Sequence, residues 1–163
     1  MPPRSADSRA FTLVEIMVVL VILAIGAAMV IPQVVSMSDL EAVSAARMLS
    51  CDLQYAQDTA ITSQLPVTVS FDPTGESYEL TNASGALIHP MTKSDYVVSF
   101  PAQRGLEELD VVSANFGGSA SVTFDELGSP DNGGSVVLQA GPHRYRVSVA
   151  DATGKVTVTQ LGS

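Results

Sequence analysis

Residues 11–31, FTLVEIMVVLVILAIGAAMVI, form a continuous apolar run with only two polar side chains. At about 1.5 Å of rise per residue, a helix of that length spans about 30 Å, the thickness of a bilayer's hydrocarbon core. The apolar side chains surround such a helix on every side. The pattern therefore predicts a transmembrane helix over 11–32, with a kink where Gly26 and Pro32 bracket its end, because proline removes a backbone hydrogen bond.

A second, amphipathic helix is predicted over residues 33–64. Ser38 and Glu41 have the spacing of a capping box at its start, and Pro66 prevents much extension beyond residue 63. Cys51 falls on the face opposite the apolar stripe, which predicts that its thiol lies outside the core. Six residues at alternating spacings of three and four predict one narrow buried stripe: Ala42, Ala46, Leu49, Leu53, Ala56 and Ala60.

From residue 65 onward the apolar positions alternate with polar ones, and turn residues separate short runs. The residues at 82–85 are predicted to form one of these turns. With no helical pattern between the runs, an antiparallel β domain is predicted over 65–163. The predicted strands are 67–71, 77–81, 96–100, 109–114, 121–124, 135–139, 144–149 and 155–159. The fold class is therefore α+β, with a long N-terminal helix packed on an antiparallel β-sheet or β-sandwich.

The composition and the motifs argue against several classes of function. A formal charge of −9 opposes binding to a phosphate backbone, and a single cysteine excludes an internal disulfide. His89 and His143 are far apart and have no neighbouring cysteine, so they form no metal-ligand pattern. No phosphate-binding glycine loop, nucleophile elbow or zinc-protease motif is present. We therefore expect no enzyme activity, no cofactor and no metal.

The residues around the start of the apolar run resemble a known signal. The sequence AFTLVE over residues 10–15, followed by the apolar run, is similar to the class III signal of type IV pilins and type II secretion pseudopilins. The resemblance implies that a prepilin peptidase removes the leader 1–10 by cutting between Ala10 and Phe11 and then N-methylates Phe11. Glu15 becomes the fifth mature residue and Pro32 the twenty-second, in register with the family, whereas Ala10 stands where the family has glycine.

The C-terminal half strengthens the resemblance. Phe124 followed by Gly128, and then Thr153-Gly154-Lys155 before a last strand, is similar to the GspH/FimT group of minor pseudopilins and minor pilins. The resemblance implies a pilin-like fold and a structural subunit at or near the tip of a type II secretion pseudopilus. Its implied partners are other minor and major pseudopilins and the inner-membrane assembly platform. The implied location is the inner membrane, crossed once, with the β domain in the periplasm.

An ionised carboxylate inside an apolar helix needs a partner, because at mid-bilayer it costs about 2.5–3.5 kcal/mol. In the resembled family, that partner is the N-terminal amine of a neighbouring subunit, which predicts that Phe11 and Glu15 are the assembly residues. The alternative is a FimT-like minor pilin that takes up DNA or helps to assemble a pilus. Arg144 and Arg146 lie two apart, hence on one face of a strand, but the mature chain after loss of the leader has 16 acidic residues and a charge of −10.

Overall fold

The computed structural model describes residues 12–30 and 37–162. The chain consists of two compact units, Met1–Val35 and Ser36–Ser163. The first contains α1 (Leu13–Val30), which continues through Gly26. The described side chains of α1 are all exposed. Among the residues that the structure describes, no helix is long and apolar enough to cross a membrane. The transmembrane helix predicted over 11–32 extends beyond the described residues at both ends.

The start of α1 is capped by its own sequence. Thr12 Oγ1 accepts a hydrogen bond from the backbone N–H of Glu15 at 3.2 Å, and the Thr12 carbonyl accepts from the N–H groups of Glu15 and Ile16. Thr12 therefore acts as an N-cap with glutamate three residues later, a spacing typical of helix starts. The position in the first turn also places the Glu15 carboxylate at the positive end of the helix dipole.

The second unit is built on α2 (Met37–Ser63), which ends where the sequence predicts. All six residues of the predicted stripe are fully buried, and Ala45 is buried beside them. Because most of these residues are alanines, their small side chains allow the sheets to approach the helix closely. Leu49 and Leu53 are the stripe's large side chains, and each buries more apolar area than an alanine does, at about 25 cal/mol per Å².

The predicted capping box at the start of α2 is wrong. Ser38 already lies inside the helix and is half-buried under the Gly141 turn, where a Cβ on the glycine would lie 3.3 Å from the serine side chain. The Glu41 carboxylate accepts a hydrogen bond from the backbone N–H of Glu108 at 2.9 Å instead. The Glu41 side chain, which the local pattern assigned to the cap, therefore takes part in a tertiary contact instead.

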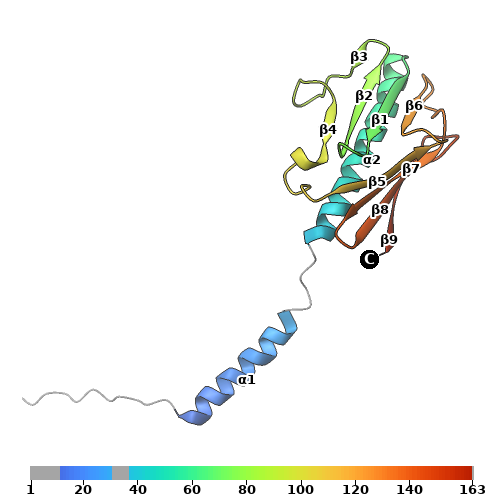
Figure 1. Ribbon diagram of the computed structural model, residues 1–163. Helices are drawn as coiled ribbons and strands as arrows, with labels where there is room; N and C mark the ends of the chain where they lie inside the picture. Colours follow the sequence, from blue (N-terminus) through green and yellow to red (C-terminus); the bar gives the residue numbers. More distant parts are fainter. Residues whose placement is uncertain (1–11, 31–36, 163) are drawn as a thin grey trace, which may run out of the picture. The chain divides into compact units, whose positions relative to one another are not determined.

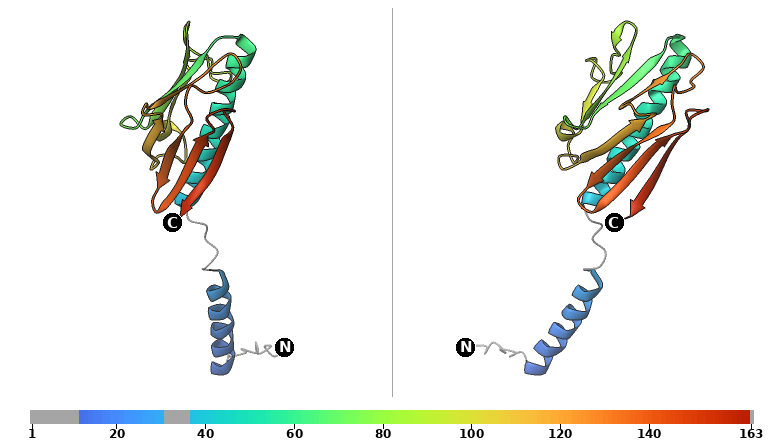
Figure 2. Two further views of the ribbon diagram at one scale, coloured as in Figure 1. Left: turned by 90° about the vertical axis from the view of Figure 1, so that its right-hand side faces the viewer. Right: turned by 45° about the vertical axis from the view of Figure 1, so that its right-hand side comes forward.

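Two antiparallel sheets cover the buried face of α2 (Figure 1). The first has the order β3-β2-β1-β6, with β4 also paired to β2, and the second has the order β5-β7-β8-β9. Figure 2 shows the helix running along the back of both sheets. The strands of the first sheet are β1 (Val67–Asp72), β2 (Ser77–Asn82), β3 (Gly85–Ala86), β4 (Val97–Ser99) and β6 (Ser121–Phe124). Those of the second are β5 (Asp110–Phe116), β7 (Gly134–Ala140), β8 (His143–Val149) and β9 (Val156–Gly162).

All eight predicted strands are present, which confirms the α+β class. The predicted strand over 96–100 is shorter, because a 3-10 turn, η2 (Phe100–Ala102), begins at its end. The turn predicted at 82–85 is tighter than expected: Asn82 pairs with Gly85, so that Gly85 opens β3. Gly85 has a φ of +117°, a conformation that glycine adopts without steric cost.

Candidate assembly site

The predicted assembly residues lie only partly in the described chain. Ala10, Phe11 and Pro32 lie outside it, so cleavage, methylation and the kink stay predictions. Glu15 is exposed in the first turn of α1, and Gly26 lies inside α1, where a Cβ would meet no atom within 4 Å. The second unit adds a set of polar contacts that hold α2 to its two sheets.

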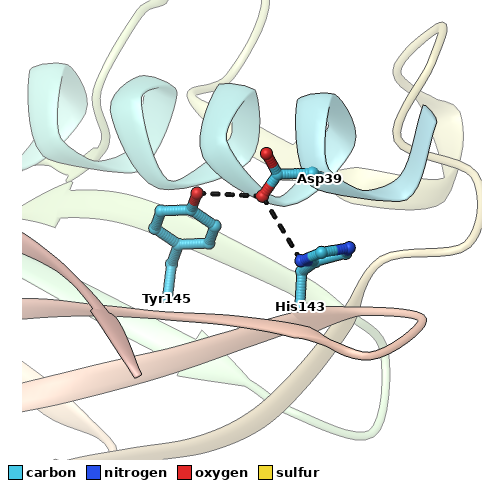
Figure 3. A network of polar contacts seen from close by, with 3 residues as sticks. All are labelled: Asp39, His143 and Tyr145. Atoms are coloured by element: carbon cyan, nitrogen blue, oxygen red, sulfur yellow. Dashed lines mark hydrogen bonds and ion pairs between the residues drawn. The ribbon is translucent and has the colours of Figure 1, made fainter. Parts of the chain in front are cut away.

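The first of these contacts joins the beginning of α2 to β8 (Figure 3). The Tyr145 hydroxyl donates a hydrogen bond to Asp39 Oδ1 at 3.0 Å, and His143 Nδ1 lies 3.5 Å from the same oxygen. Burial raises the pKa of Tyr145, and the hydrogen bond to Asp39 adds to the effect. His143 and Tyr145 lie two positions apart on β8, so both side chains point to the same face and reach one carboxylate oxygen of Asp39. These contacts fix the start of α2 against the four-stranded sheet.

The second contact joins the middle of α2 to the other sheet. Tyr78 of β2 donates its hydroxyl to Asp52 Oδ2 at 2.5 Å, and Tyr96 donates to Oδ1 at 3.0 Å. Burial raises the pKa of Asp52 although both hydrogen bonds lower it, and burial beside Asp52 raises the pKa of both tyrosines. The Tyr96 ring packs against those of Tyr55 and His89, at centroid distances of 5.4 and 4.5 Å.

The third contact explains the two glycine motifs of the C-terminal half. Gln57 Nε2 donates to the carbonyl of Gly128 at 2.7 Å and to that of Thr153 at 3.0 Å. Both glycines of the motifs have positive φ values, +79° at Gly128 and +64° at Gly154. A Cβ at Gly154 would lie 2.4 Å from Gln57 Nε2, so glycine is needed for the approach as well as for the turn. The two motifs meet at one glutamine of α2.

Sequence reasoning did not identify Asp39, Asp52 or Gln57. They are half-buried polar residues beside the apolar stripe of α2. A polar side chain at the border of such a stripe is the sequence feature that could have indicated these contacts. Of the four tyrosines, three donate to aspartates of this helix: Tyr78, Tyr96 and Tyr145. A raised pKa keeps these hydroxyls protonated at neutral pH, so they act as hydrogen-bond donors.

Cys51 is exposed, as predicted. Within residues 12–30 and 37–162, no three His, Cys, Asp or Glu side chains are grouped so that they could hold a metal ion. The contacts at Asp39, Asp52 and Gln57 form a structural joint between one helix and two sheets.

Comparison with known proteins identifies the family of the chain. Residues 45–154 match the family described as type II transport protein GspH, and residues 5–31 match the prokaryotic N-terminal methylation motif. No curated protein matches the chain.

Two solved structures share the fold. The minor pseudopilin EpsH from the type II secretion system of Vibrio cholerae is 14% identical with a TM-score of 0.53, over 75% of this chain and 97% of that one. The type IV minor pilin FimU of Pseudomonas aeruginosa is 20% identical with a TM-score of 0.54, over 74% of this chain and 90% of that one. At sequence identities this low, the structural similarity shows a common fold and nothing more.

Proposed function

The chain belongs to the GspH family of type II transport proteins, and we propose that it is a minor pseudopilin at or near the tip of a secretion pseudopilus, where it supports protein export across the outer membrane. The observation that carries this proposal is the combination of two matches in one chain: the family over 45–154 and the methylation motif over 5–31. The first covers most of α2 and of the β domain, and the second supports a role in processing and assembly.

Processing is the first step of the proposed function. A prepilin peptidase and methyltransferase removes residues 1–10, cuts between Ala10 and Phe11, and methylates Phe11. Residues 11–32 then hold the subunit in the inner membrane, with the domain over 65–163 in the periplasm. The methylation motif and the run of apolar residues after Phe11 support this order of events.

Assembly follows from the chemistry of Glu15. A carboxylate in an apolar segment is most favourable when a positive group from a neighbour reaches it, because desolvation penalises either charge alone. Cleavage before Phe11 creates such a group, a new amine, on each subunit. Glu15 thus pairs with the Phe11 amine of a neighbouring minor or major pseudopilin as the inner-membrane assembly platform adds subunits.

The second unit suits the role of a rigid head on a filament subunit. Three separate polar contacts attach α2 to both sheets, at Asp39, Asp52 and Gln57. Helix and sheets therefore move together when the helix is pushed or pulled. No catalytic step is needed for this work, and we propose that the chain is not an enzyme.

A minor pilin for DNA uptake or pilus assembly is the second candidate, supported by the fold shared with FimU. Deleting the gene distinguishes the two. A secretion subunit leaves exported proteins in the periplasm after deletion, and the full chain restores export. Unchanged export together with a loss of transformation by external DNA would favour the pilin function instead.

A further inference from the structure

β9 forms one edge of the four-stranded sheet (Figure 1). Six of its seven residues are exposed, and its sequence, VTVTQLG, contains no charge and no proline. In the part of the chain that the structure describes, no strand pairs with its outer side. Proteins usually protect such an edge with charges, proline or a bulge, because an open edge binds other strands.

The opposite edge of the same sheet is protected. β5 begins with Asp110 and has a bulge between Val111 and Ser113. β9 has its own irregularity near its end, where Leu161 is the extra residue between the pairs Tyr145–Gln160 and Arg144–Gly162, and the stretch 156–160 forms a regular ladder. The regular part of β9 is thus the unprotected edge of this sheet.

The hydrogen-bonding groups of β9 that face outward follow from the register. The N–H of Ala150 donates to the carbonyl of Lys155 at 3.0 Å, and these two residues lie opposite each other. Antiparallel pairs alternate between bonded and non-bonded, so Thr157 and Thr159 are bonded to β8. The backbone N–H and C=O groups of Val156 and Val158 point to the open side.

The outer face next to this edge is cationic. Arg144, Arg146 and Lys155 are exposed, and Arg146 pairs with Thr159, whose side chain is short. β7, β8 and β9 contain no aspartate or glutamate, whereas the whole chain has 17. Arg144 Nε donates to Gln139 Oε1 at 2.6 Å, and among the described residues neither arginine forms an ion pair.

We propose that the open edge of β9 binds an extended segment of a partner polypeptide as a fifth strand, with carboxylates at alternate positions facing Arg146 and Lys155. Backbone hydrogen bonds provide the affinity, and the cations select for acidic side chains in the partner's sequence. Main-chain and side-chain contacts usually divide these two roles in β-strand addition. An added strand lies about 4.8 Å beyond β9. A glutamate on it is then within reach of an arginine that extends over Thr159.

Two other occupants fit less well. A second copy of this chain would bring another β9, which has no carboxylate for the arginines, and both copies have a charge of −9. Nucleic acid has no peptide backbone that pairs with a strand edge. Three cations on one face of an acidic chain are also too few to neutralise a long run of backbone phosphates. The inference does not depend on which secretion or pilus system the subunit serves.

The test measures binding of a labelled octapeptide that alternates glutamate and valine to the full chain in detergent, by fluorescence anisotropy. We expect binding that weakens with salt and is more than about tenfold weaker in Val158→Pro, which removes an outward N–H and leaves the β8 ladder intact. Arg146→Glu should weaken binding by at least as much, and Arg146→Lys should retain part of it. Arg104→Glu, an exposed loop charge, is the matched control, and an octapeptide of lysine and valine should not bind.

Circular dichroism shows whether Val158→Pro folds; if it does not, Arg146→Glu decides, because its side chain is exposed. Equal binding by wild type and Arg146→Glu would overturn the proposal, and so would unchanged binding by a folded Val158→Pro. Binding of duplex DNA with a log–log salt slope of about −2, lost in Arg146→Glu but not in Val158→Pro, would identify a phosphate site instead. Self-association of the wild type that disappears in Val158→Pro but not in Arg146→Glu would identify a second copy as the occupant.

Discussion

At the level of single residues, aspartates and tyrosines hold the amphipathic helix to the sheets. Asp52 is half-buried and accepts two hydroxyl hydrogen bonds, from Tyr78 and Tyr96. Hydrogen bonds to a charged group contribute about 1.5–3 kcal/mol each, and a buried group left without its partner also costs its desolvation penalty. The strength of this joint therefore depends on the number of donors that reach the carboxylate.

Tyr78→Phe is expected to lower the free energy of unfolding of residues 36–163 by about 1–3 kcal/mol at pH 7, because Asp52 loses its closer donor. Urea unfolding followed by circular dichroism measures the change. Tyr55→Phe is the matched control: among the described residues its hydroxyl makes no hydrogen bond, so it should stay within about 0.5 kcal/mol of wild type. Equal losses in the two variants would show that the hydroxyl contact with Asp52 is not what stabilises the joint.

The same tyrosines predict a loss of stability in alkali. The pKa values of Tyr78, Tyr96 and Tyr145 are raised in the folded state above the ordinary value of about 10. The folded chain then holds more protons than the unfolded chain above about pH 10, so the stabilisation is complete below that pH and is lost as pH rises through the folded pKa values. Urea midpoints measured from pH 8 to 11 should fall only above about pH 10, and less steeply in Tyr78→Phe. A midpoint that is constant to pH 11 would contradict the assignment.

Glu15 is the residue whose charge we propose to be needed for assembly. Glu15→Val removes the insertion penalty, so the amount in the membrane and the cleavage should be unchanged. The attraction to a neighbour's amine is lost, however, and for a partly buried pair this attraction amounts to several kcal/mol. We expect crosslinking to other pseudopilins to disappear and secretion to fall, whereas Met17→Val, an exposed apolar position on the same helix, should change neither. Normal secretion by Glu15→Val would exclude this residue from the mechanism.

At the level of elements, α2 unites the fold because both sheets pack on its one stripe of alanine and leucine. Its polar contacts occur at its start, middle and last third, at Asp39, Asp52 and Gln57. The alanines allow close approach but bury little area, so Leu49 and Leu53 are the stripe positions most sensitive to change.

Leu53→Asp should prevent residues 36–163 from folding, because a carboxylate would be buried at that site without a partner. Leu53→Ala should lower the free energy of unfolding by about 2–5 kcal/mol and leave a folded domain. Thermal unfolding measures both. The neighbouring, exposed Gln54→Asp is the control and should melt close to wild type. A Leu53→Asp variant that melts like its parent would contradict the buried position of this face.

At the level of the whole molecule, charge is distributed unevenly. The chain has 17 acidic and eight basic residues, yet three adjacent strands of one sheet contain no acid at all. An acidic molecule in which three adjacent strands carry cations and no acid has a preferred orientation toward acidic partners, since complementary potentials steer encounter. The N-terminal methylation motif and the family-matched domain lie in separate units of the chain.

Processing should be visible in the mass of the whole molecule. Intact-mass measurement of membrane-extracted protein is expected to show the loss of residues 1–10 and the gain of one methyl group on Phe11. Protein from cells without the prepilin peptidase is the control and should retain the leader. A mature N-terminus after Ala27 or Ala28 would indicate an ordinary secretory signal, and the filament function would then be excluded.

The sequence by itself determined the elements of this protein, because helix and strand periodicity depend on residues only a few positions apart. The stripe from Ala42 to Ala60 and the alternation around Val69 each reflect one burial pattern within one element, and the structure confirms both. The methylation signal is likewise local, and the matching motif over 5–31 agrees with it.

Only the tertiary structure decided which residues join the elements. The hydroxyl of Tyr145 and the carboxylate of Asp39 are 106 positions apart, and Gln57 and Thr153 are 96 apart. No local period relates residues at such separations, since the strand order that brings them together is set by the packing of two sheets on one helix. For the same reason the capping-box prediction at Ser38 failed and the open edge of β9 could not be predicted: both depend on which neighbour lies beside a segment after the chain has folded.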